Sequence, residues 1–174
     1  PVTVHKRSVN IAKKLSNGSY SPSINKDLVT LKSSLSREDL IGCNLEQAYN
    51  LKESLKISIP YKYSDDGCVE YYLPQAEDLL LKNLRANKHV NPEKIVPPIQ
   101  SQSNCWFNTM FVTFFVSDKG RKFFHFLRQL MIKGTQKDKK SIPDSLRDAF
   151  ALLNFGIDSC LSGSEFAYEL DTNS

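Results

Sequence analysis

The segment over residues 100–115 most constrains what this chain can fold into. A polar run after Pro97 and Pro98 changes abruptly at Cys105 into a dense apolar stretch. Asn104 is a favoured N-cap residue, so the pattern predicts a helix whose first turn contains Cys105. Free N–H groups and the helix dipole favour a thiolate at that position, which predicts a nucleophilic sulfur. Apolar residues surround most of the helix, so we expect it to be buried on nearly all sides.

The residues that follow Cys105 resemble the cysteine box of the ubiquitin-specific proteases, a family of papain-like cysteine peptidases. In that family an aromatic residue, a bulky apolar residue, an asparagine and a small hydroxyl residue follow the nucleophile. All four positions match here, as Trp106, Phe107, Asn108 and Thr109. The resemblance implies that Cys105 is the catalytic nucleophile.

A second site residue comes from the same resemblance. Five residues before its nucleophile the family carries an asparagine that helps to form the oxyanion hole. Gln100 stands at that position and keeps the amide donor, so it would hold the oxyanion together with the Cys105 backbone N–H. The glycine-containing lead-in of the family is replaced here by residues 101–104.

The resemblance extends over residues 97–155. Residues 114–124 are similar to the family's second helix, and residues 141–150 are similar to its Ser-Val-Pro segment. This implies the thumb half of a papain-like peptidase, with an α+β fold that is mainly helical and a small N-terminal hairpin. Three ranges follow: a basic arm over 1–24, a helical and hairpin extension over 25–96, and a thumb-like subdomain over 97–174.

A cysteine nucleophile needs a base, and the chain has three histidines. His125 falls inside a predicted helix and is interpreted as a residue at the edge of the core. His89 is interpreted as a solvated residue after a helix, and His5 lies near the terminus. No catalytic histidine is identified, so we expect no activity if this chain is complete. If it is part of a longer protein, the base can lie downstream.

The other three cysteines lack a helix-start motif. Cys43 and Cys160 lie in apolar contexts that favour helices and small buried side chains, and Cys68 opens a predicted strand. The wide spacing argues against a zinc site and against a secreted disulfide framework. We therefore expect an intracellular, reducing compartment, with no metal and no cofactor.

Periodicity predicts the remaining elements. A helix is expected over 25–35, and a second from Ser36 to Leu55, with Asp39 completing a capping-box-like start. Strands are expected over 57–63 and 68–73, followed by a helix over 75–86. Asn91 and the prolines up to Pro98 predict an extended linker.

The charge and hydropathy of the chain limit the classes of partner that we expect. The net charge of +4 is modest, and a lysine cluster over 133–140 is interpreted as a charged loop, so nucleic acid is not expected as a partner. No apolar run is long enough to cross a bilayer. The resemblance implies a ubiquitin-like protein tail as substrate.

Two other function classes stay open. One is a catalytically inactive structural protein of a larger assembly that retains the fold. The Lys-, Asn- and Ser-rich composition is similar to that of large DNA virus proteins, so a virion component belongs to this class. The other is a module that binds a ubiquitin-like protein without cleaving it.

Overall fold

The computed structural model describes residues 38–59, 67–86, 90–100, 103–136, 138–168 and 170. The chain divides into two units, Pro1–Ser36 and Arg37–Ser174, and all described residues lie in the second. The predicted arm over 1–24 and the predicted helix over 25–35 therefore lie outside the described residues. The described part is mostly helical and has one small antiparallel sheet, which confirms a mixed α+β content.

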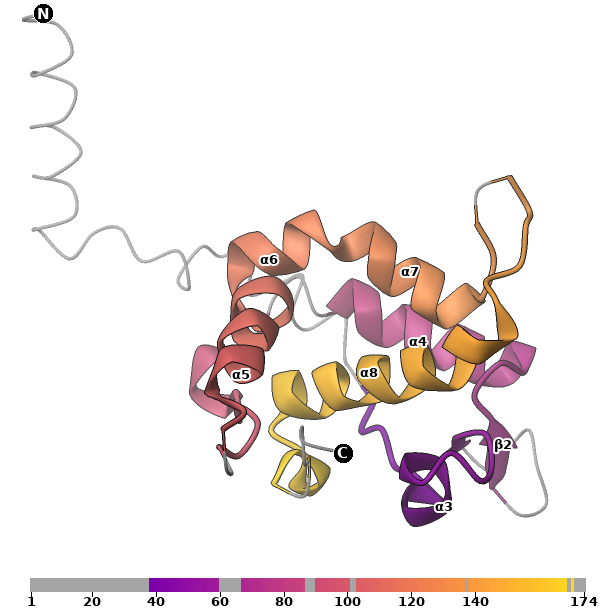
Figure 1. Cartoon of the computed structure of the whole chain (residues 1–174), viewed down its shortest axis with the longest axis horizontal. Helices are drawn as coiled ribbons and strands as arrows, with labels where there is room; N and C mark the ends of the chain where they lie inside the picture. The colour runs from indigo at the N-terminus through magenta and orange to yellow at the C-terminus, as the bar shows by residue number, and fades with distance from the viewer. Residues whose placement is uncertain are drawn as a thin grey trace, which may run out of the picture. The chain divides into compact units, whose positions relative to one another are not determined.

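The elements follow one another in chain order and are labelled as in Figure 1. They are α3 (Leu45–Tyr49), β1 (Lys56–Ser58), β2 (Cys68–Glu70), α4 (Pro74–Ala86), the 3-10 turn η2 (Pro92–Lys94), α5 (Cys105–Phe111), the π-helical segment η3 (Val112–Val116), α6 (Asp118–Phe123), α7 (His125–Lys133), α8 (Asp144–Ser162) and the 3-10 turn η4 (Glu165–Ala167).

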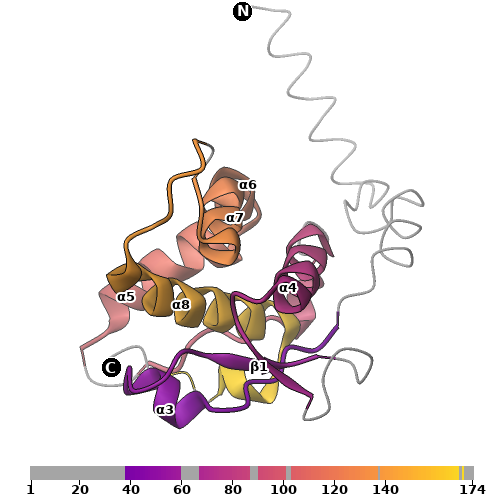
Figure 2. The same cartoon turned by 90° about the vertical axis from the view of Figure 1, so that its right-hand side faces the viewer.

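The sheet forms where the alternating pattern predicts strands. β1 and β2 pair antiparallel, with Ile57 opposite Val69 and both side chains buried. Each described strand has three residues, shorter than predicted, and residues 60–66 lie outside the described part. The sheet and α3 lie on one side of α8, with α7 on the other (Figures 1 and 2).

The predicted helix from Ser36 to Leu55 is wrong over most of its length, because only Leu45–Tyr49 are helical in its described part. The segment before α3 pairs with β1 instead, through an isolated bridge between Gly42 and Ile57. Asn44 then fixes the end of that segment, since its side chain accepts from Lys56 N at 2.8 Å and donates to Ser54 O at 3.0 Å.

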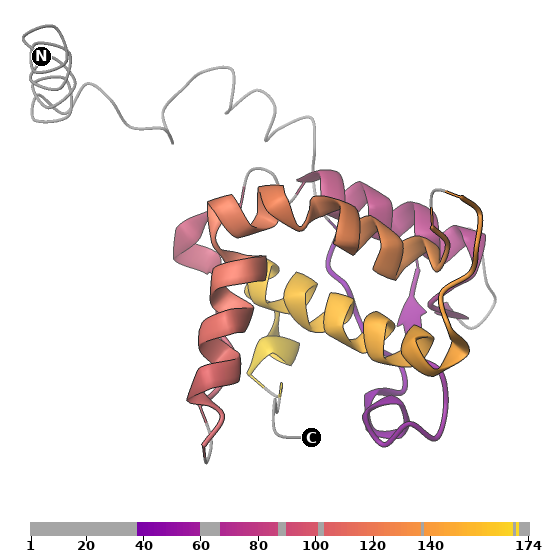
Figure 3. The same cartoon turned by 45° about the horizontal axis from the view of Figure 1, so that its top comes forward.

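One buried core joins the sheet to α4, α7 and α8. It contains Ile57 of β1, Leu80 of α4, Ile132 of α7 and Phe155 of α8, all buried. Burial of each such side chain contributes about 1.5 to 3 kcal/mol. Figure 3 shows α4 alongside α7, and α7 alongside part of α8. This core draws on residues from both sides of position 97.

A second buried cluster holds the helix that starts at Cys105. Phe111 of α5 and Val116 of η3 pack against Ile157, Cys160 and Leu161 near the end of α8. In Figures 1 and 3, α5 lies at the C-terminal end of α8, away from α3 and β2. The cysteine-bearing helix is therefore fixed against the C-terminal end of α8.

Candidate active site

Cys105 is the first residue of α5, as the sequence predicts, and it has an exposed free thiol. Asn104 occupies the N-cap position, but its side chain makes no capping hydrogen bond. Its backbone carbonyl instead accepts from Asn108 N at 3.0 Å, and the Thr109 hydroxyl donates to the Cys105 carbonyl at 2.8 Å. The first turn of α5 is thus held by bonds of its own residues.

Two asparagines tie the preceding segment to this turn. Asn104 Nδ2 and Asn108 Nδ2 donate to the carbonyl of Ile99, at 3.4 Å and 3.3 Å. Asn104 is buried, and the two residues are four apart, so they lie on the same side of the helix. This asparagine clamp was missed from the sequence, although the spacing of the two asparagines could have indicated it.

Gln100 follows the clamped residue directly and is exposed. Residues 101 and 102, between Gln100 and α5, lie outside the described part. The clamp therefore brings the backbone next to Gln100 to the start of the helix. The role of its amide as an oxyanion donor stays a prediction.

The linker ahead of the clamp is anchored on the end of α8. Val96 N donates to the Cys160 carbonyl at 3.0 Å. Gly163 ends α8 with φ 67°, and a Cβ there would lie 2.3 Å from the Lys94 carbonyl oxygen. Only glycine combines this positive φ with so close an approach. The chain that leads to Cys105 is therefore held by hydrogen bonds at Val96 and Ile99, and it packs closely on Gly163 at Lys94.

His125, the only histidine in the described ranges, begins α7 and is half-buried. Its Nε2 lies 3.3 Å from Gln129 Nε2, and its ring lies edge-on to Phe126 with 5.9 Å between ring centres. Both of these partners belong to α7 itself, and the interpretation of His125 as a residue at the edge of the core stays a prediction. His5 and His89 lie outside the described residues.

The expectation that the cysteine helix is buried on nearly all sides is wrong. Trp106 is 64% exposed, Met110 42% and Phe114 39%. Their spacing of four residues places them in one stripe along α5 and η3, while Phe111 and Val116 face the core. The sequence shows apolar residues all round, but the buried residues of α5 and η3 pack against α8 and η4 on one side.

The exposed stripe continues onto α6. The ring of Phe124 lies 5.0 Å from those of both Phe114 and Phe123, and Phe123 is 80% exposed. We call Trp106, Met110, Phe114 and Phe123 the aromatic face. Neither α5 nor η3 contains a charged residue. Exposed apolar side chains gathered in this way typically mark a contact surface.

The remaining cysteines differ from Cys105. Cys160 is buried in α8 as predicted, and burial raises the pKa of its thiol to about 12. Cys68 begins β2 as predicted. The expectation for Cys43 is wrong, since it is exposed in a loop and forms a disulfide with Cys68. This bond counts against the expected reducing compartment.

The structure also bears on two other possibilities, a metal site and a membrane-spanning helix. In the described ranges, no three side chains among His, Cys, Asp and Glu come together as a metal site would require. None of the described helices is both long and apolar enough to cross a membrane.

Comparison of the chain with protein-family models, curated proteins and solved structures found no match.

Proposed function

We propose that this chain carries the nucleophile of a thiol hydrolase similar to the ubiquitin-specific proteases, which cleaves an isopeptide or peptide bond at a ubiquitin-like tail. One observation carries the proposal. Cys105 lies in the matching cysteine box and opens a helix with its free thiol exposed, while Cys160, the other free cysteine, is buried. In this proposal residues 97–155 form the thumb of a papain-like fold.

The reaction would proceed through a thioester. The Cys105 thiolate attacks the carbonyl carbon, the amine leaves with a proton, and water then hydrolyses the acyl-enzyme. The Cys105 backbone N–H and the Gln100 amide would stabilise the oxyanion. The asparagine clamp supports this role, because it holds the residue before Gln100 at the start of α5.

The proton acceptor is a separate question. A general base must lie within hydrogen-bond reach of the thiol or act through a water molecule. We do not assign this role to His125, which the sequence indicates to be a helix residue at the edge of the core. The proposal also places the protein in an intracellular reducing compartment, where Cys105 stays a thiol; the Cys43–Cys68 bond weighs against that part.

The aromatic face is also compatible with a second candidate function. A catalytically inactive structural component of a larger assembly, such as a virion, would use exposed apolar side chains to contact its neighbours. Trp106 and Phe123 are the most exposed members of this face. The same face beside an active Cys105 would contact substrate, so the two candidates differ in chemistry rather than in surface.

Labelling with ubiquitin that carries a C-terminal electrophile separates the two. We expect a single adduct, mapped to Cys105 by peptide mass analysis, and none with the Cys105→Ala variant. Cys160→Ala is the matched control and should label like the wild type. A folded wild-type chain that reacts with a small alkylating reagent at Cys105 but forms no ubiquitin adduct would favour the structural candidate.

A further inference from the structure

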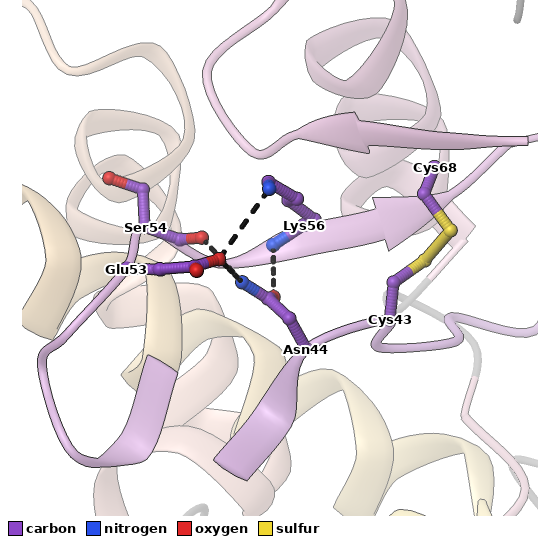
Figure 4. The surroundings of a disulfide bond; sticks show 6 residues. All are labelled: Cys43, Asn44, Glu53, Ser54, Lys56 and Cys68. Carbon is purple, nitrogen blue, oxygen red and sulfur yellow. Dashed lines mark hydrogen bonds and ion pairs between the residues drawn. A yellow bond between two sulfur atoms is a disulfide. The ribbon is translucent and has the colours of Figure 1, made fainter. Parts of the chain in front are cut away.

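The Cys43–Cys68 disulfide lies near the end of β1 and joins the two segments that pair with this strand (Figure 4). On one edge of β1, Cys43 N donates to the Lys56 carbonyl at 2.9 Å. On the other edge, Cys68 of β2 lies opposite Ser58. The bond therefore joins the two segments that flank β1, and neither partner belongs to β1 itself.

The disulfide lies on the solvent side of these strands. Side chains alternate between the two faces of a strand, and Ile57 and Val69 occupy the core side. Cys68 is opposite Ser58 on the other face. Cys43 is exposed and Cys68 is half-buried. A thiol in solution can thus approach the sulfur of Cys43 without unfolding of the core.

Other contacts hold the same segments together without the disulfide. Ser58 N donates to the Ile41 carbonyl at 2.9 Å, and Asn44 binds the backbone of Lys56 and Ser54. The buried side chain of Ile57 anchors β1 on the side that faces the core. With the bond broken, these contacts would keep the two cysteines close, at a Cα separation near the 6.4 Å of the bonded pair, within the range that a disulfide spans.

We propose that Cys43 and Cys68 form a reversible thiol–disulfide exchange site whose co-reactant is a low-molecular-weight thiol or disulfide of the glutathione class. In the oxidation, the Cys43 thiolate attacks one sulfur of the small disulfide, and a small thiolate leaves. The Cys68 thiolate then attacks the Cys43 sulfur of the mixed disulfide, which releases the second small thiolate.

The exchange balances without another reactant. Two electrons pass from the two protein thiols to the small disulfide, and the two protons that the protein thiols lose are taken up by the two small thiolates. Reduction is the reverse and consumes two small thiols. The site involves neither Cys105 nor the activity proposed for it.

The redox state would control how firmly the segment over residues 41–43 stays on the edge of β1. In the oxidised form the segment is tied covalently across β1 to β2. In the reduced form it is held by hydrogen bonds and by Asn44. Local opening of this edge should then be more frequent, because an exposed edge held by few contacts is a low-stability part of a fold.

Redox titration of the full chain tests the proposal. The protein is equilibrated in buffers of different reduced to oxidised glutathione ratios, quenched in acid, alkylated and mapped by mass. We expect one native-state transition between the dithiol and the disulfide, with the same midpoint from both directions. Cys105→Ser should leave that midpoint unchanged. Thiols that alkylate at every ratio, or a bond that is reduced only after denaturant is added, would overturn the proposal.

Hydrogen exchange tests the consequence for the fold. The amides of Cys43 and Ser58, which bond across the edge of β1, should exchange more slowly in the oxidised form by a factor of about ten. Cys43→Ser and Cys68→Ser should each reproduce the fast exchange of the reduced wild type. Equal exchange in both redox states would show that the bond does not hold the segment.

Discussion

Arg128 of α7 and Asp158 of α8 form an ion pair with 3.1 Å between Nη2 and Oδ1, and both side chains are almost fully buried. Arg128 Nε also donates to Asn154 Oδ1 at 2.6 Å, and Asn83 of α4 donates to Asp158 at 3.3 Å. Asn83 in turn exchanges hydrogen bonds with the backbone of Glu38. The network therefore joins three helices to the start of the described chain.

Removal of Asp158 should be among the most destabilising single changes in this protein. Asp158→Ala leaves the Arg128 guanidinium buried without its carboxylate, which costs about 3 to 5 kcal/mol of unfolding free energy. Urea denaturation would measure this loss. Asp118→Ala is the matched control, because Asp118 is 84% exposed in its pair with Arg121 and should cost less than about 1 kcal/mol. Equal losses would contradict the expectation.

Gly120 allows α6 to pack on η3. A Cβ at this position would lie 2.1 Å from the Thr113 carbonyl oxygen and 2.4 Å from that of Phe114. Since backbone atoms cannot move aside cheaply, Gly120→Ala should cost about 1 to 3 kcal/mol or more by overpacking. Lys119→Ala, an exposed change on the same helix, should have little effect. Thermal unfolding of both variants tests this, and a Gly120→Ala melting point equal to that of Lys119→Ala would refute the clash.

The asparagine clamp can be tested apart from the thiol. Asn108→Ala removes one of the two donors to the Ile99 carbonyl and should cost about 1 kcal/mol of stability. If Gln100 acts as proposed, the variant should also lose labelling by the ubiquitin electrophile, while a small alkylating reagent still modifies Cys105. Thr109→Val is the control, because the Thr109 hydroxyl bonds within α5. An Asn108→Ala variant that labels like Thr109→Val would sink the positioning role.

Tyr72 makes stability depend on pH in the alkaline range. Burial raises the pKa of its phenol from 10.0 to about 12, and the hydroxyl donates to the Arg147 carbonyl. The folded state therefore holds this proton more tightly than the unfolded state. The resulting stability is complete below pH 10.0 and is lost as the pH rises toward about 12.

Tyr72→Phe provides the comparison, because phenylalanine does not titrate. The difference in unfolding free energy between wild type and variant should stay constant up to about pH 9 and shrink above pH 10. Urea midpoints at several pH values, with the tyrosine absorbance followed in parallel, measure this. A difference that stays constant through pH 11 would contradict the raised pKa.

Local signals predicted the elements that depend on neighbouring residues. The helix from Pro74 starts at a proline, which suits a first helical position, and α5 starts after Asn104 as expected. The helix predicted up to Leu55 failed because Leu40 and Leu55 match a helical stripe but are buried from extended segments. Periodicity alone does not distinguish these two ways of reaching the core.

Features that join distant segments could not be predicted. Cys43 and Cys68 are 25 residues apart, and Arg128 and Asp158 are 30 apart, so only the folded arrangement pairs them. The aromatic face could not be predicted from the sequence for a related reason. The composition of α5 shows that every side is apolar, but which side is covered depends on where α8 and η4 pack.

Because the linker is anchored on the end of α8, a substitution at that end of α8 is expected to affect the distant Cys105. A bulkier residue at position 163 would push the Lys94 carbonyl away, and that displacement would pass along the linker to Ile99 and the first turn of α5. In a screen for Cys105 reactivity such a variant would resemble a substitution in the cysteine box, although position 163 lies 58 positions after Cys105. The last turn of α8 therefore helps to set the position of the Cys105 thiol.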